Sequence, residues 1–250
     1  METLAVFHIL KNGGTTLVDR YKHNDEFVYQ RVKHELVYNY QQPNQKRIHI
    51  DDVFYNAPTV VFGHGVSFDW DILSTGNVKY ATILRNPRDR IISAFNYFRL
   101  EMNTIHGITT DIDFRTWFIN RSRLLPTPVF YQLQTFTDMP TSCLYSEYGL
   151  TLNNKLLLDL YPQAIKNIDK IDYVFFMDDN YINKFDKLMS NYNLTPAQDV
   201  VHTHDTRYQL DNIGVSYITY DQLNNSDKDL LDSHLHIDSK FYEYCWDKFR

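Results

Sequence analysis

The sequence predicts an α/β protein in which the whole chain, 1–250, forms a single domain around a doubly wound parallel sheet. Strands buried on both faces of such a sheet read as short, nearly continuous apolar runs. Four runs of this kind occur, at Val6–Ile9, Val60–Phe62, Tyr80–Leu84 and Tyr173–Met177. Segments with helical periodicity lie between and after them, at Asp25–Tyr38, Pro87–Leu100, Phe114–Arg121, Asn154–Ile168, Asn180–Tyr192, Tyr220–Ser233 and Ser239–Phe249. This alternation is typical of α/β folds.

The length and composition favour one ordered domain. A chain of 250 residues can bury a sizeable core, and only 8 Gly and 8 Pro leave little material for flexible linkers. Two polar, turn-rich segments, Tyr40–Pro58 and Thr195–Gly214, are assigned to neither helix nor strand. Such loops are either active-site covers or ordinary surface, and both interpretations stay open.

Charge and cysteine usage limit the partners. The net charge of −6 argues against a nucleic-acid-binding protein, although a local basic pocket can exist on an acidic chain. Cys143 and Cys245 form no C-x-x-C motif and suggest neither a zinc knuckle nor a redox site; one disulfide between them is left open. The first residues lack a signal peptide, and no apolar run approaches the ~20 residues of a membrane span. A soluble, cytoplasmic protein is expected.

The stretch FHILKNGGTTLVDRY near the start of the chain predicts a strand, a glycine turn and a helix. In open parallel sheets ligands bind beyond the carboxyl ends of the strands, where a helix N-terminus favours an anion. Gly13 and Gly14 allow a tight turn, and Lys11 adds a cation at its mouth. Thr15 and Thr16 can cap the helix and donate hydroxyl hydrogen bonds. The turn suits a phosphate or sulfate, and a plain strand-to-helix turn is the alternative.

The order of lysine and glycines distinguishes this turn from the nucleoside-triphosphate loop G-x-x-x-x-G-K-[ST], because here Lys11 precedes the glycines. The segment HILKNGGTT resembles the motif H-I-P-K-T-G-G-T-S of sulfotransferases that use 3′-phosphoadenosine 5′-phosphosulfate (PAPS), especially their carbohydrate and membrane-type branch. It departs from that motif at Leu10 and Asn12. The resemblance implies a P-loop NTPase-like fold whose turn binds the phosphosulfate through Lys11, Asn12, Gly13, Gly14, Thr15 and Thr16.

A second stretch, ILRNPRDRIISAFNYF, resembles the later motif R-D-P-x-x-R-x-x-S-A-Y of the same family. Asn86 can cap a helix, and Pro87 is preset for the first helical position. The resemblance implies that Arg85 and Ser93 hold the 3′-phosphate of the donor, with paired guanidinium donors. Taken alone, the stretch also fits a solvated helix with surface arginines. Weaker similarities lie in VVFGHGVSF, YQLQTF, FFMDDNYINKFDKL and DSKFYEYCWDKF.

Sulfuryl transfer requires charge stabilisation on the departing phosphate and, for an alcohol acceptor, a base. Lys11 is the expected charge stabiliser. The family's G-H-x-x-F segment implies that His64 is the base, and a histidine that only hydrogen-bonds a loop is the alternative. His8 is expected in the core. Asp178 and Asp179 are expected to cap a helix start, and contact with the acceptor is the alternative.

No metal is expected. The pairs His202/His204 and His234/His236 have the i, i+2 spacing of one strand face, but no carboxylate or thiol pattern completes a site.

The sequence therefore favours a PAPS-dependent sulfotransferase acting on an acceptor hydroxyl, most of all that of a carbohydrate, with PAPS as co-substrate. A nucleotide kinase is one alternative, and the missing G-K-[ST] speaks against it. A noncatalytic nucleotide- or anion-binding module is another, supported by the departures at Leu10 and Asn12. Neither the acceptor nor the oligomeric state follows from the sequence.

Overall fold

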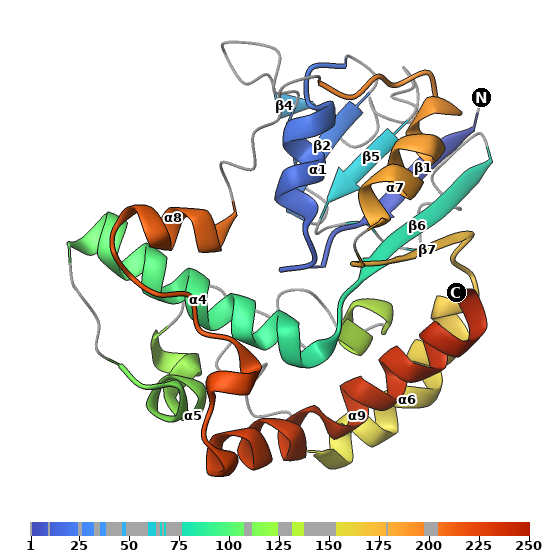
Figure 1. The fold of residues 1–250 in the computed structure, drawn as a ribbon. Coiled ribbons are helices and arrows are strands. Elements are labelled where there is room, and N and C mark those ends of the chain that lie inside the picture. Colours follow the sequence, from blue (N-terminus) through green and yellow to red (C-terminus); the bar gives the residue numbers. More distant parts are fainter. Residues whose placement is uncertain are drawn as a thin grey trace. The chain divides into compact units, whose positions relative to one another are not determined.

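A computed structural model describes most of the chain (Figure 1). The described residues are 2–9, 11–24, 27–32, 36–38, 47–48, 60–63, 66, 68, 77–107, 112–124, 132–137, 154–178, 180–197 and 205–250. The chain divides into two compact units. The first contains Met1–Leu84, Asn167–Val201 and Lys248–Arg250, and the second contains Arg85–Lys166 and His202–Asp247. The single domain over 1–250 stays a prediction.

The first unit contains a seven-stranded sheet. Its strands, in spatial order, are β4 (Arg47–Ile48), β3 (Leu36–Tyr38), β2 (Phe27–Val32), β5 (Val60–Gly63), β1 (Thr3–Phe7), β6 (Val78–Leu84) and β7 (Tyr173–Phe176). Every neighbouring pair from β2 across to β7 is parallel, whereas β3 pairs antiparallel with β2 and β4. The predicted α/β class with a parallel sheet is therefore confirmed, with an antiparallel extension at one edge.

The strand β1 lies between two parallel neighbours, and this placement sets where its following turn stands. Phe7 lies opposite Gly63 of β5 and Thr82 of β6. Leu4 and Val6 are fully buried, as expected for a central strand covered on both faces. The turn after Phe7 consequently begins beside the carboxyl ends of β5 and β6, the edge at which parallel sheets bind ligands.

Two helices, α1 (Gly14–Tyr21) and α7 (Tyr181–Ser190), cover one face of this sheet (Figure 1). Their apolar side chains pack on those of the strands in one buried cluster, which includes Leu4, Val6, Leu17, Tyr21, Phe62, Ile83, Phe185 and Met189. Full burial of such a side chain contributes about 1.5–3 kcal/mol. Asp186 on α7 accepts from Arg20 Nε of α1 at 2.9 Å and also from the Tyr21 hydroxyl, so the two helices are held together by polar as well as apolar contacts.

The second unit is helical in its described residues. It contains α4 (Pro87–His106), α5 (Phe114–Leu124), η1 (Gln132–Phe136), most of α6 (Asn154–Ile168), α8 (Thr206–Asn212), η4 (Tyr220–Gln222) and most of α9 (Asn225–Phe249). Aromatic rings join α4 to α5, since Phe95 lies 5.4 Å from Phe114 and 5.1 Å from Trp117 between centroids. Phe136 of η1 stacks on Phe241 of α9 at 5.5 Å.

The predicted helix over Asp25–Tyr38 is wrong, because the structure has β2 and β3 there. Aromatic and β-branched residues dominate both segments, FVYQRV and LVY, and these residues favour strands. Parallel pairing with β5, in which Phe27 lies opposite Val60, decides the conformation.

The two helices predicted at Tyr220–Ser233 and Ser239–Phe249 are joined in one continuous helix, α9, which begins at Asn225, while Tyr220–Gln222 form the separate η4. The buried α9 residues Leu231, Leu235, Asp238, Phe241 and Cys245 follow each other at three- or four-residue steps, so one face stays in the core across the predicted break. Neither glycine nor proline interrupts this segment.

The other boundaries are close to prediction. The helix α6 matches Asn154–Ile168, and β5, β6 and β7 overlap their predicted runs, while β1 runs from Thr3 to Phe7 rather than from Val6 to Ile9. The helices α4 and α5 extend further than predicted. Of the unassigned segments, Tyr40–Pro58 contains β4 and Thr195–Gly214 contains α8.

Candidate functional site

The turn between β1 and α1 is fixed to the sheet by Asn12. Its side chain is buried, and Nδ2 donates to the carbonyl oxygen of Ile83 at 2.7 Å. Its backbone N–H donates to the carbonyl oxygen of Ile9 at 3.2 Å. Since the last pair of β1 with β6 is Phe7 opposite Thr82, Ile83 lies one residue beyond the end of β1, and Asn12 supplies the hydrogen bond that a longer strand would have made. The departure from the family motif at Asn12 therefore has a structural role.

Two residues of the turn adopt the left-handed backbone conformation. Lys11 has φ 66° and Gly13 has φ 75°. An L-residue in this region costs about 1–2 kcal/mol, whereas glycine does not. Lys11 is half-buried, so this residue combines a strained backbone with a partly exposed side chain.

The expected capping by the threonines is wrong. Gly13 is the N-cap of α1 and no side chain caps it. Thr15 is exposed and Thr16 half-buried in the first helical turn. The first N–H groups of a helix have no partner within it, and the helix dipole makes this end attractive to an anion.

Neighbouring side chains leave no room for a Cβ atom at either glycine of the turn. A Cβ atom on Gly14 would stand 1.9 Å from His8 Nε2, and one on Gly13 would stand 2.7 Å from the Tyr181 hydroxyl. The His8 ring also packs on Phe62 at 5.0 Å between centroids. His8 is half-buried and directly follows β1, and its ring lies against Gly14, the first residue of α1.

The start of α4 in the second unit follows the predicted chemistry. Asn86 is the N-cap and its side chain accepts from Arg88 N at 3.0 Å, while Pro87 occupies the first turn. Gln132 of η1 holds Arg85 from both sides of its backbone: Oε1 accepts from Arg85 N at 2.9 Å and Nε2 donates to Arg85 O at 2.7 Å. The backbone of Arg85 is thus fixed, and its half-buried side chain extends from a rigid base.

A buried charge pair supports the same region. Arg90 of α4 and Asp238 of α9 are 1% and 0% exposed, and Arg90 Nη2 lies 3.8 Å from Asp238 Oδ2. Leu133 N donates to Asp238 Oδ1 at 3.0 Å. Burial raises the pKa of the Asp238 carboxyl, and the Arg90 guanidinium and the N–H groups of η1 oppose that rise. Truncating one member of such a pair costs about 3–5 kcal/mol.

The arginines of the second motif therefore have different roles. Arg88 is exposed and forms paired hydrogen bonds with Asp232 at 2.7 and 2.8 Å. Arg90 is buried and has a structural role, so the alternative of a solvated helix that carries only surface arginines is wrong. Ser93 lies on α4 at 7% exposed. Gln132 and Asp238 were not predicted as site residues. They lie in YQLQTF and DSKFYEYCWDKF, two segments with weaker similarity to the sulfotransferase family.

The predicted site residues fall into three groups. Lys11 to Thr16 belong to the first unit, and Arg85 and Ser93 to the second. His64, Asp179, His202 and His204 lie outside the described residues, as do Leu10 and Cys143.

Two further side chains have structural partners. Asp178 accepts from Asn180 N at 3.0 Å and from Lys184 Nζ at 3.1 Å, but Asn180 is the N-cap of α7 and no side-chain cap hydrogen bond is present, so Asp178 contacts the helix start without capping it. His234 Nδ1 lies 2.9 Å from Leu230 O, and its ring meets Phe118 edge to face. Among the described residues, no cluster of three or more His, Cys, Asp or Glu could hold a metal ion.

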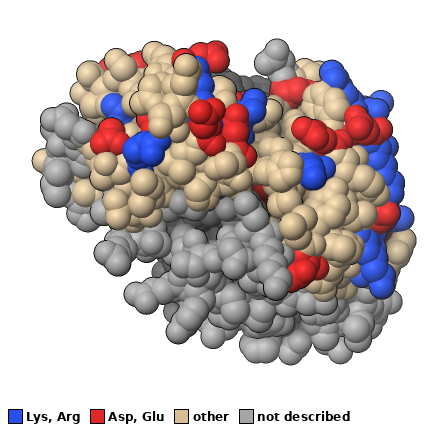
Figure 2. All heavy atoms as spheres, turned by 90° about the horizontal axis from the view of Figure 1, so that it is seen from below, with Lys and Arg blue, Asp and Glu red and all other residues tan. Residues whose placement is uncertain are grey.

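Acidic and basic side chains both occur in the view of Figure 2, and basic side chains gather along its right edge. With a net charge of −6, binding of an anionic nucleotide would depend on a local arrangement of donors rather than on a broad field. No helix in the described part of the chain has the length and hydrophobicity needed to span a bilayer.

No protein-family model and no curated protein matches this chain.

Proposed function

We propose that this protein is a PAPS-dependent sulfotransferase with a doubly wound, P-loop NTPase-like fold. It moves the sulfuryl group to a hydroxyl of a carbohydrate acceptor. The observation that carries the proposal is the turn after β1: a helix start without a side-chain cap, two left-handed residues, and Asn12 fixing the turn to β6. The similarity of both motifs to the sulfotransferase family supports the choice of a phosphosulfate as the anion.

The reaction breaks the bond between sulfur and the 5′-phosphate oxygen and forms a bond between sulfur and the acceptor oxygen. The acceptor proton passes to the imidazole of His64, and 3′-phosphoadenosine 5′-phosphate (PAP) leaves. Lys11 and the N–H groups at the start of α1 balance the charge that develops on the 5′-phosphate. Arg85, held by Gln132, and Ser93 bind the 3′-phosphate. No metal is needed, because the protein supplies the positive charge.

Thermal unfolding with nucleotides tests this function. PAP without magnesium should stabilise the protein, by about 2.7 kcal/mol at a concentration one hundred times its dissociation constant, and magnesium-ATP should stabilise it much less. Labelled PAPS with a pool of sugars should then give a labelled product. Stronger stabilisation by magnesium-ATP would favour a kinase. PAP binding with no transfer to any acceptor would favour the noncatalytic module.

A further inference from the structure

The second unit has an open pocket of about 430 Å³ on its surface. Its lining residues are Arg207, Asp211, Ser216, Tyr217, Thr219 and Gln222. The volume lies in the range of small-molecule binding sites. Two of these residues, Arg207 and Asp211, lie in Thr195–Gly214, the polar segment that was predicted as neither helix nor strand.

The wall of this pocket is anchored to α4, the helix that begins with the second motif. The buried side chain of Asn96 donates to Ile218 O at 2.7 Å and accepts from Ile218 N at 2.9 Å. Arg99 Nη1 donates to Ser216 O at 2.8 Å. These bonds attach the loop between α8 and η4 to α4, and this loop forms one wall of the pocket.

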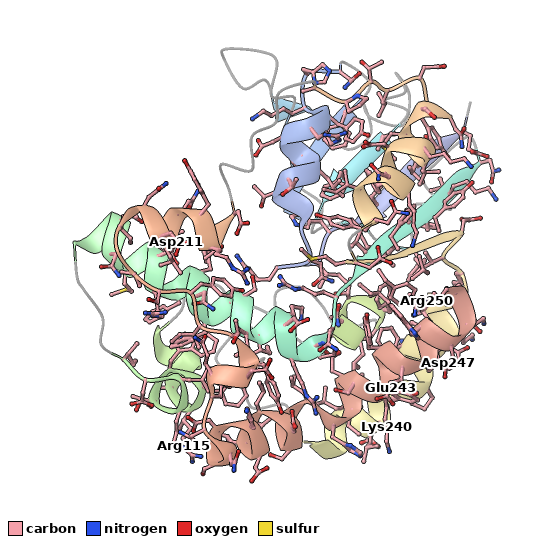
Figure 3. The ribbon with its side chains drawn as sticks, viewed as in Figure 1. Arg115, Asp211, Lys240, Glu243, Asp247 and Arg250 are labelled. Atoms are coloured by element: carbon pink, nitrogen blue, oxygen red, sulfur yellow. The ribbon has the colours of Figure 1, made fainter. Side chains whose placement is uncertain are left out.

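Two side chains of α8 bring opposite charges to the pocket. Arg207 lies over the ring of Tyr217, with 4.8 Å from Cζ to the ring centroid, which restrains the guanidinium. Asp211 stands in the last turn of α8 (Figure 3), where the helix dipole disfavours a carboxylate. Within the described residues neither side chain forms an ion pair.

The composition of the lining points to a ligand class. One guanidinium and one carboxylate cancel in net charge, which favours a ligand without net charge over an anion or a cation. A carboxylate can accept from neighbouring hydroxyls, a guanidinium donates to oxygen atoms, and serine, threonine and glutamine can do either. The Tyr217 ring adds an apolar surface of the kind that packs on carbon-bound hydrogens.

We infer that this pocket binds a neutral saccharide, with Asp211 accepting from its hydroxyls and Arg207 donating to its oxygens. The further step, that this saccharide is the acceptor of the sulfuryl group, rests on the proposed function. Sugar binding itself does not, because it needs neither donor nor transfer.

Saturation-transfer NMR of the full chain with galactose, glucose, N-acetylglucosamine and lactose tests the pocket. Glucuronate and galactose 6-sulfate serve as charged probes. At least one neutral sugar should bind, and Asp211→Asn and Arg207→Gln should each weaken it about tenfold or more, as expected for a lost hydrogen bond to a charged group. Asp159→Asn on α6, an exposed carboxylate outside the pocket, is the matched control and should bind as the unmodified protein does.

Three outcomes overturn the inference: no neutral sugar binds, a sugar binds equally to the pocket variants, or a charged probe binds far more tightly than every neutral sugar. PAP stabilisation, measured in parallel, separates this failure from failure of the proposed function. If PAP binds and neutral sugars do not, only the pocket assignment is lost. If sugars bind at the pocket and PAP does not, only the sulfotransferase proposal is lost.

Discussion

Asn12 Nδ2 donates a hydrogen bond to the carbonyl oxygen of Ile83, at 2.7 Å, and so joins the turn after β1 to the end of β6. Arg85 follows Ile83 by two residues along the chain. The bond therefore connects the predicted phosphosulfate turn to the strand that leads into the predicted 3′-phosphate motif.

Asn12→Ala should lower the free energy of unfolding by about 1–3 kcal/mol, because the buried Ile83 carbonyl would lose this donor. Chemical denaturation measures the change. Asn183→Ala, at an exposed position on α7, is the control and should cost less than about 0.5 kcal/mol. Equal effects of the two substitutions would mean that the bond contributes nothing.

Substitutions at Lys11 should separate its backbone from its charge. Lys11→Gly should be more stable than Lys11→Ala by about 1 kcal/mol, because glycine adopts the positive φ without strain. Both variants lack the ammonium group and should slow sulfuryl transfer by about 10²–10³-fold, the range for one lost stabilising donor. Chemical denaturation measures the free energy of unfolding of each variant, and single-turnover assays with labelled PAPS measure its transfer rate. A normal transfer rate in Lys11→Gly would remove Lys11 from the chemistry.

Recognition of the 3′-phosphate should depend on Arg85 and on its support by Gln132. Arg85→Ala should weaken PAP binding by about 1.5–3 kcal/mol and leave binding of adenosine 5′-monophosphate, which lacks that phosphate, unchanged. Gln132→Ala should reduce the same discrimination by a smaller amount, because the Arg85 backbone would no longer be fixed. Calorimetry measures both ligands. Arg88→Ala is the control, since Arg88 is paired with Asp232; a larger loss there would place the phosphate elsewhere.

If His64 is the base, the transfer rate should rise with pH as an imidazole loses its proton. His64→Ala should slow transfer by about 10²–10⁴-fold and leave PAP affinity unchanged. Single-turnover rates measured across a pH series test both expectations. His8→Gln cannot serve as the control, because His8 packs against Gly14. A full rate in His64→Ala would turn the search to His202 and His204.

Asp113 should make the second unit sensitive to acid. Its carboxylate accepts from Thr116 N and from the Thr116 hydroxyl, each at 2.8 Å, and these bonds lower the pKa of Asp113. A carboxyl with a lowered folded-state pKa stabilises the protein above its unfolded-state value of ~3.9 and loses that contribution as pH falls through the folded-state value.

Asp113→Ala should therefore cost about 0.5–2 kcal/mol at neutral pH, as for other helix caps, and the difference should shrink in acid. Asp113→Asn keeps a capping side chain and should cost less. Thermal unfolding over a pH series measures both. A cost for Asp113→Ala that does not change with pH would assign the effect to packing rather than to the charged cap.

Local chemistry in the sequence determined those elements whose causes lie within a few neighbouring residues. The helix start at Asn86 and Pro87 was predictable because a capping side chain and a preset φ act on adjacent backbone. The bounds of α6 and the strand-turn-helix around Gly13 followed from periodicity and glycine geometry in the same way.

Only the tertiary structure decided what depends on distant partners. Phe27–Val32 was predicted as part of a helix; its aromatic and β-branched residues favour a strand, and parallel pairing with β5 decided that conformation. The buried partners of the candidate site lie far apart in the chain: Asn12 and Ile83 are separated by 71 residues, and Leu133 and Asp238 by 105. A hydrogen bond or buried charge pair between such residues leaves no periodic signal in the sequence, because its geometry exists only once the chain has folded and excluded water from both groups.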